Sequence, residues 1–268
     1  MMRLDGTVAC VTGGARGIGR ATAIALAARG AQVWIGDIDL PVAEATAAEI
    51  GGHAAQLDVT DPGSFAEFLN AATETGPVDV LVNNAGIMRL APFLELDLAG
   101  HHREIAINVG GVINGMSLAL PGMVARGRGH IVNVASMAAK VTTPGAAVYC
   151  ASKFAVGALS RAVRAELDGT GVTVTTVMPA AVHTELTSGV NLKLQPTLHP
   201  AEVGEAIADT VRHRRAEVTI PRWLAPMGTV EQGIPETALR AVKRQFVGRE
   251  PGRYDQQRRR AYLNRIDS

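Results

Sequence analysis

Short apolar runs alternate with segments of helical periodicity along most of this chain. The run "TVACV" at 7–11 ends in a glycine loop, and the apolar residues of "IGRATAIALAARG" then recur at helical spacing. Parallel strands need crossover helices between them, so this order favours an α/β fold with a doubly wound parallel sheet and helices on both faces. We expect about seven strands, and the further apolar runs lie at 31–37, 53–59, 78–86, 130–136, 172–179 and 216–223.

Nothing in the sequence divides this pattern into two domains. Helical segments are expected at 39–52, 61–76, 97–125 and 149–168. We therefore expect one domain over 1–222, with a substrate loop at about 184–200. Residues 223–268 differ in character, because from Arg222 onward the chain has ten Lys or Arg against five Asp or Glu. They are interpreted as a basic C-terminal extension packed on the same domain or on a neighbouring subunit.

The composition fits a compact globular protein. The 268 residues are 47% hydrophobic and 19% charged, with a formal net charge of +1. A nearly neutral chain has no broad basic surface for a nucleic acid. Cys10 and Cys150 belong to no cluster of metal-binding spacing. We expect a cytoplasmic protein with no nucleic-acid partner and no metal.

One uncharged segment, 105–125, is about long enough to span a bilayer. Asn108, Asn114 and Pro121 interrupt it, and such residues are costly in lipid. We therefore expect a helix buried inside a soluble protein or its oligomer.

The loop "TGGARGIG" has the spacing of a dinucleotide-binding turn. Gly13, Gly17 and Gly19 follow a strand and open a helix, where backbone N–H groups can bind a pyrophosphate. Asp37 ends the second strand, where a carboxylate accepts hydrogen bonds from the adenosine ribose. Together they predict a Rossmann fold that binds NAD, since Asp37 would repel the 2′-phosphate of NADP. Arg16 could pair with that phosphate, so NADP stays the less favoured alternative.

The stretch "ASMAAKVTTPGAAVYCASK" at 135–153 combines three residues that can exchange a proton. Tyr149 and Lys153 are four apart, so they share a helix face, and an ammonium beside a phenol is expected to lower the pKa of the phenol. Ser136 ends a strand, at the sheet edge where open α/β folds bind ligands. A tyrosine in this setting predicts general acid/base catalysis.

Taken together, these motifs resemble the short-chain dehydrogenase/reductase family over roughly residues 5–220. The matching features, in order, are "TGGARGIG" at 12–19, Asp58 with Val59, "NNAG" at 83–86, Asn108, Ser136 and "YCASK" at 149–153. The resemblance implies an oxidoreductase that exchanges a hydride between a secondary alcohol or ketone and nicotinamide. It also implies a homodimer or homotetramer.

The resemblance implies a role for each matching residue. Tyr149 would be the general acid/base, Lys153 would bond the nicotinamide ribose, Ser136 would position the substrate oxygen, and Asn108 would hold a water that links Lys153 to solvent. The cofactor-binding residues implied are Gly13, Arg16, Gly17, Ile18, Gly19, Asp37, Asp58, Val59, Asn84, Ala85, Gly86, Tyr149, Lys153, Pro179, Val182 and Thr184.

One position departs from the family pattern. The family usually has Pro-Gly after the sixth strand, whereas this chain has Pro179-Ala180. Alanine fits there only if its φ is negative. Val182 and Thr184 still fall where the family contacts the nicotinamide carboxamide.

The segments that flank the site favour a neutral, apolar alcohol or ketone, such as a steroid, a retinoid or a xenobiotic. The basic extension is expected to lie over the substrate mouth, with a membrane surface beside Trp223 and Met227 as the alternative. Two other functions stay open: an NADP-dependent ketone reductase, and a protein that binds the dinucleotide without turnover.

Overall fold

Seven parallel strands form the central sheet of the protein. The computed structural model describes residues 3–190, 196–228, 233–235, 237 and 255–267. Every pairing in the sheet is parallel. In spatial order the strands are β3 (His53–Gln56), β2 (Gln32–Asp37), β1 (Val8–Thr12), β4 (Val78–Asn83), β5 (Gly129–Val134), β6 (Val172–Pro179) and β9 (Glu217–Ile220). The predicted α/β Rossmann fold is confirmed.

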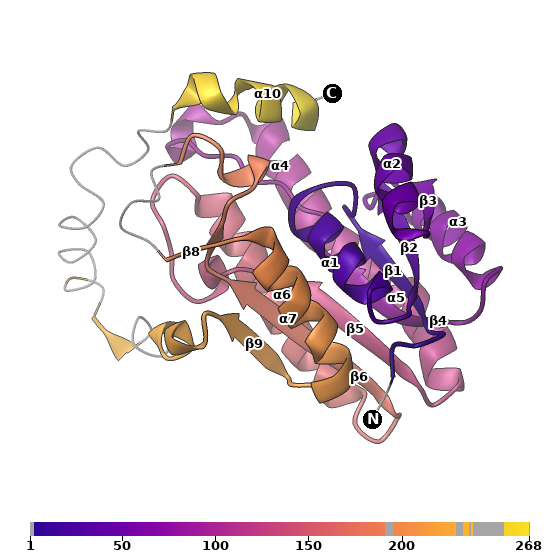
Figure 1. Ribbon diagram of the computed structural model, residues 1–268. Helices are drawn as coiled ribbons and strands as arrows, with labels where there is room; N and C mark the ends of the chain where they lie inside the picture. Colours follow the sequence, from indigo (N-terminus) through magenta and orange to yellow (C-terminus); the bar gives the residue numbers. More distant parts are fainter. Residues whose placement is uncertain (1–2, 191–195, 229–232, 236, 238–254, 268) are drawn as a thin grey trace.

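Helices cover both faces of this sheet (Figure 1). One face carries α1 (Gly17–Ala27), α2 (Leu40–Ile50) and α7 (Pro200–His213), and the other carries α3 (Pro62–Thr73), α5 (Gly111–Ala125) and α6 (Ala147–Glu166). Strand β1 shows why there are two cores. Its side chains alternate between faces, so Ala9 and Val11 pack in one core and Val8 and Cys10 in the other.

The long helical stretch expected at 97–125 contains a wider turn. α4 (Leu98–Ile105) passes through the π-helical turn η2 (Ala106–Gly110) into α5. A π turn inserts an extra residue into the helix, and such turns are frequent at functional sites. Here the turn contains Asn108, which is 1% exposed.

The stretch Leu98–Ala125 is long and apolar enough to cross a membrane by length and composition, and 33% of its most apolar window is buried. Two of its polar residues are bonded inside the protein. The Nδ2 group of Asn114 donates to the carbonyl of Val59, and Asn108 is bonded to Ile87. A core helix of a soluble protein passes the same length and composition test.

Several short elements surround the carboxyl edge of the sheet. The 3-10 turns are η1 (Phe93–Glu95), η3 (Met137–Ala139), η4 (Glu185–Thr187) and η5 (Arg222–Leu224), and β7 (Ala181–Val182) pairs with β8 (Thr197–Leu198). α10 (Gln256–Asp267) lies near the C-terminus. Part of the expected substrate loop, 191–195, and much of the extension, including 238–254, fall outside the described residues.

Candidate active site

A large cavity of about 2080 Å³ opens at the carboxyl edge of the sheet. Its lining includes the glycine loop after β1 at one end and Ser136, Tyr149 and Lys153 at the other. Open α/β folds bind ligands at this edge, where the strand order reverses. The structure thus places both predicted groups of residues along one cavity.

The glycine loop packs too closely on its neighbours to accept side chains. Gly13 has a φ of +61°, and a Cβ there would lie 2.9 Å from Cα of Ala85. A Cβ on Gly19 would lie 2.0 Å from the carbonyl oxygen of Gly13. Gly17 has a φ of +54° and faces the methyl group of Thr184. The loop therefore presents bare backbone and the N-terminus of α1 to the cavity.

Asp37 is fixed at the end of β2 by two backbone amides. Its Oδ2 accepts from the N–H of Ala15 at 3.0 Å, and its Oδ1 accepts from the N–H of Asp39 at 3.1 Å. The guanidinium of Arg16 donates to Oδ2 of Asp39 at 2.8 Å. This hydrogen bond holds the pKa of Asp39 below its usual value.

The "NNAG" segment joins β4 to the glycine loop. The Nδ2 group of Asn84 donates to the carbonyls of Thr12 and Gly13, and the N–H groups of Asn84 and Ala85 donate to Oγ1 of Thr12. A Cβ on Gly86 would lie 3.1 Å from Oδ1 of Asn108. These bonds fix the floor of the cavity between its two ends.

Asp58 and Val59 follow β3, and they differ in burial. Asp58 is exposed, and its Oδ1 accepts from the N–H and the hydroxyl of Thr60. Val59 is buried against Gly111 of α5, and its carbonyl accepts from Asn114. Both residues line the cavity beside the glycine loop.

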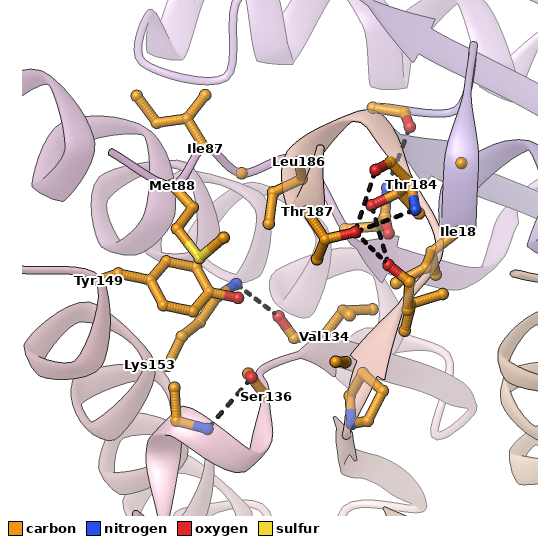
Figure 2. Close-up of a pocket in the computed structure, with 18 of the residues that line it drawn as sticks. Ile18, Ile87, Met88, Val134, Ser136, Tyr149, Lys153, Thr184, Leu186 and Thr187 are labelled. Atoms are coloured by element: carbon orange, nitrogen blue, oxygen red, sulfur yellow. Dashed lines mark hydrogen bonds between the residues drawn. The ribbon is translucent and has the colours of Figure 1, made fainter. Parts of the chain in front are cut away.

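Three of the four predicted catalytic residues, Ser136, Tyr149 and Lys153, lie together at the other end of the cavity (Figure 2). The hydroxyl of Ser136 accepts from the N–H of Ala138 at 3.1 Å, and it acts to lower the pKa of the neighbouring Tyr149. Lys153 lies in α6 one turn after Tyr149, and its Nζ is 5.6 Å from the centre of the tyrosine ring. That Nζ donates to the carbonyl of Val134 at 3.0 Å.

Asn108 is anchored to the segment after β4. Its Oδ1 accepts from the N–H of Ile87 at 2.8 Å, and its Nδ2 donates to the carbonyl of the same residue at 2.9 Å. The Nδ2 also donates to Oγ of Ser152 in α6. Asn108 therefore ties the π turn to the strand end and to the helix of Tyr149.

The expected pKa of Tyr149 needs a correction. Burial raises the pKa of Tyr149 above its ordinary value, and Ser136 only partly opposes this. Burial also lowers the pKa of Lys153 to about 8. Removing water penalises the phenolate and the ammonium alike. The net change in the pKa of Tyr149 is therefore upward, opposite to the lowering expected from Lys153.

Glu104 is a charged residue near the site that the sequence analysis missed. It is 0% exposed, its Oε1 accepts from the N–H of Arg89, and its Oε2 has no hydrogen-bond partner among the described residues. Burial raises its pKa to about 7. Glu104 lies four residues before Asn108, and this spacing on one helix face was the available signal.

The backbone after β6 accommodates Ala180, which stands where the family usually has glycine. Among the described non-glycine residues only Arg214 has a positive φ, so Ala180 has a backbone that alanine adopts without strain. Its N–H donates to the carbonyl of Ile220 at 2.7 Å. Pro179 ends β6, and Val182 and Thr184 follow along the cavity wall.

The cavity around Tyr149 is mostly apolar. The residues here that sequence analysis did not single out come from the β4–α4 connection, from the segment after Thr184 and from the C-terminal extension. They are Met88, Leu90, Leu186, Val190, Tyr262 and Ile266. Their positions follow from tertiary packing, since α10 is far from the other segments in sequence.

The strand order and the cavity at the switch point define a class of α/β proteins that bind dinucleotides. Residues 7–195 match the family model described as short chain dehydrogenase. The chain belongs to the short-chain dehydrogenase/reductase family of oxidoreductases, which confirms the resemblance inferred from the motifs.

Known proteins agree with this assignment. The chain is 44% identical over 199 residues to a sorbitol dehydrogenase of Cereibacter sphaeroides, covering 72% of this chain and 77% of the relative. It is 44% identical over 190 residues to a D-threitol dehydrogenase of Mycolicibacterium smegmatis, covering 69% and 73%. A family member from Burkholderia phymatum, solved in complex with NAD, superposes with a TM-score of 0.78 at 25% identity, covering 85% of this chain and 94% of that one.

Proposed function

We propose that this protein is an NAD(H)-dependent oxidoreductase that interconverts a secondary alcohol and a ketone. The observation that carries the proposal is the joint placement of the glycine loop and of Ser136, Tyr149 and Lys153 along one cavity. The relatives named sorbitol dehydrogenase and D-threitol dehydrogenase act on alcohols by their names, which supports the reaction class.

The residues present fit a dinucleotide. A Cβ would fill the cradle at Gly13, Gly17 and Gly19, so the loop is shaped for close backbone approach, with the N-terminus of α1 toward a pyrophosphate. Asp37 would bind the adenosine ribose, and Asp58 and Val59 the adenine. Asn84, Ala85 and Gly86 would line the adenosine ribose. The nicotinamide half would lie along Lys153, Pro179, Val182 and Thr184.

The preference for NAD rests on charge. Asp37 ends β2 at the ribose position, and a carboxylate there would repel a 2′-phosphate. Arg16, the residue that could have offset this repulsion, is paired with Asp39 at 2.8 Å. Its positive charge is therefore partly neutralised before any phosphate is met. Both observations favour NAD over NADP.

The mechanism follows from the groups at the apolar end. When bound, nicotinamide supplies the carbon that accepts or donates the hydride, and its oxidised ring adds a positive charge. Ser136 lines the cavity together with Tyr149 and would hold the substrate oxygen beside the tyrosine hydroxyl. Once it has lost its own proton, Tyr149 takes the alcohol proton during oxidation, and as the phenol it returns that proton during reduction. The positive charge of the oxidised ring would favour the phenolate against the burial that disfavours it. Lys153 would pass the proton on from Tyr149, and Asn108 would hold a water that links Lys153 to solvent.

The lining near Tyr149 favours an apolar substrate over a polyol. The side chains there include Met88, Leu90, Leu186 and Ile266, which offer no hydrogen bonds to a chain of hydroxyl groups. A carbocyclic or aryl secondary alcohol fits this lining, in the class of steroids, retinoids or xenobiotics. The cytoplasmic location and the homodimer or homotetramer expected from the sequence stay predictions.

The test combines binding with turnover. NADH and NADPH are titrated separately, and secondary alcohols are screened with the wild type and with Tyr149→Phe. We expect tighter binding of NADH, and a kcat lowered about 10²-fold to 10⁴-fold in the variant, the usual contribution of a general acid/base. Retained NADH affinity in the variant is the control for its fold.

Three results would redirect the proposal. Tighter binding of NADPH would point to an NADP-dependent reductase. Nucleotide binding without turnover of any alcohol or ketone would favour a protein that only binds the dinucleotide. Full activity of Tyr149→Phe would exclude the proton-transfer role.

A further inference from the structure

The C-terminal helix α10 is bonded to two segments that border the cavity. Arg259, in its first half, is 1% exposed. Its Nη1 donates to the carbonyls of Leu186 and Ser188, each at 2.9 Å, and its Nη2 donates to the carbonyl of Met88 at 2.8 Å. One buried guanidinium thus links the segment after β4 with the segment around η4. α10 contacts η4, although the two elements are far apart in sequence (Figure 1).

The segment after β4 connects α10 to the proposed catalytic residue Asn108. The N–H of Met88 donates to the hydroxyl of Tyr262 at 2.8 Å, so both backbone polar groups of Met88 are bonded to α10. Both backbone polar groups of the preceding residue, Ile87, are bonded to Asn108. Two consecutive residues therefore connect the C-terminal helix to the π turn.

On the second segment, α10 approaches closely along its length. The N–H of Asp255 donates to the carbonyl of Gly189, and Oγ of Ser188 donates to the carbonyl of Arg258. A Cβ on Gly189 would lie 2.5 Å from the carbonyl oxygen of Asp255, so this contact requires glycine. Near the other end of the helix, Arg265 forms an ion pair with Glu185.

The face of α10 toward the protein is part of the cavity. Tyr262 and Ile266 are buried together with Ile87, and Leu186 packs against them. Tyr262, Arg265 and Ile266 also line the cavity that holds Tyr149. The helix α10 thus forms part of the cavity wall, in addition to its hydrogen bonds with the two segments.

We propose that α10 forms a wall of the substrate site in its own subunit, and that Arg259 is the positioning residue that sets the spacing of the two segments and so determines which substrates bind. This inference rests on the proposed function. A planar guanidinium can bond carbonyls on two separate segments at once, whereas a lysine ammonium on a flexible chain lacks that fixed geometry. Arg259 is not among the residues that line the cavity, so its effect on substrates passes through the two segments that it bonds.

The experiment uses the full-length protein and four forms of it: wild type, Arg259→Met, Arg259→Lys and Arg260→Met. Arg260 is the matched control, because it is the next arginine of the same helix and is exposed. The rates of oxidation of 2-propanol and of a bulky aryl secondary alcohol are measured with NAD. The affinity of each form for NADH is measured as well. Hydrogen exchange is followed at 86–90, at 185–190 and at the glycine loop.

We expect Arg259→Met to lower kcat/KM for the bulky alcohol relative to 2-propanol by about tenfold or more, the discrimination that apolar pockets provide. Most of the loss should appear in KM, and NADH affinity should stay within about threefold. Arg259→Lys should recover less than half of the loss in the ratio of kcat/KM for the two alcohols. Arg260→Met should give the wild-type ratio. Exchange should rise at 86–90 and 185–190 in Arg259→Met, and not at the glycine loop.

An unchanged ratio of the two substrates in Arg259→Met, with wild-type turnover intact, would overturn the inference. So would unchanged exchange at the two segments. If the wild type turns over no alcohol, the proposed function fails, and the exchange measurement still decides whether Arg259 holds the wall. If Arg259→Met does not fold, Ile266→Ala replaces it. The removed side-chain atoms should then raise kcat/KM for the bulky alcohol relative to 2-propanol, and an unchanged ratio would count against the wall.

Discussion

At the scale of single residues, burial moves the pKa values of Glu104 and Lys153 toward each other. It raises the pKa of Glu104 to about 7 and lowers that of Lys153 to about 8, because the low-dielectric interior disfavours either charge. The positive charges of Arg89, Lys153 and Arg259 act against the rise at Glu104 but do not cancel it. Glu104 is itself one of the groups that raise the pKa values of Tyr149 and Tyr262.

The titration of Glu104 makes stability depend on pH. Its pKa is higher in the folded protein, at about 7, than its ordinary value of 4.5. As pH rises through this window, the unfolded chain loses the proton first, so the wild type loses stability, by about 3 kcal/mol at most. Glutamine does not titrate, and we expect the stability of Glu104→Gln relative to wild type to increase from pH 5 to pH 8.

Chemical denaturation at the two pH values measures this difference. Glu67→Gln, at an exposed glutamate of α3, is the control and should show a much smaller pH-dependent change. A stability difference between Glu104→Gln and wild type that is the same at pH 5 and pH 8 would show that Glu104 does not titrate as described.

At the scale of elements, hydrophobic patterning predicted strands and most helices well. Each strand of the sheet lies within or close to its predicted apolar run, since a parallel strand buried on both faces reads as a continuous apolar segment. The pairing of β7 with β8 was not predicted, because two-residue strands carry no periodicity. The π turn η2 was also missed, because the bonds between Asn108 and Ile87 that accompany it join residues 21 apart.

The connection between β1 and α1 gives a prediction at the same scale. Gly19→Ala should destabilise the protein by about 1–3 kcal/mol and abolish NADH binding, since the new methyl group would overlap the carbonyl of Gly13. Gly110→Ala is the matched control, because a Cβ there meets nothing within 4 Å and its φ is −56°. We expect it to be neutral or stabilising by up to about 1 kcal/mol. Denaturation and NADH titration measure both effects, and equal behaviour of the two variants would contradict the packing argument.

At the scale of the whole molecule, an apolar face remains uncovered in a single chain. Ile113, Leu118 and Val124 of α5 are exposed, and a shallow groove beside them is lined in part by Leu159 and Val163 of α6. Burying such a face against a second copy is favourable, and family membership favours an oligomer. We propose that these two helices pair with their counterparts across a two-fold axis.

This assembly can be tested with one surface substitution. Ile113 is 45% exposed, so Ile113→Glu should leave the subunit folded while placing a charge in the interface. We expect light scattering to give a dimer or tetramer for the wild type and a smaller species for the variant. Leu94→Glu, at a residue 94% exposed in η1, is the control and should leave the mass unchanged. A wild-type mass equal to one chain would exclude the interface.

The sequence by itself determined the α/β class, the dinucleotide loop and the family. Those features depend on local periodicity and on motifs whose residues are close in sequence, such as Tyr149 and Lys153. Only the tertiary structure decided the partner of Arg16, the sign of the pKa change at Tyr149, the burial of Glu104 and the placement of α10 along the cavity. Each of these depends on dielectric environment or on contacts between distant segments, and neither is encoded in a local pattern.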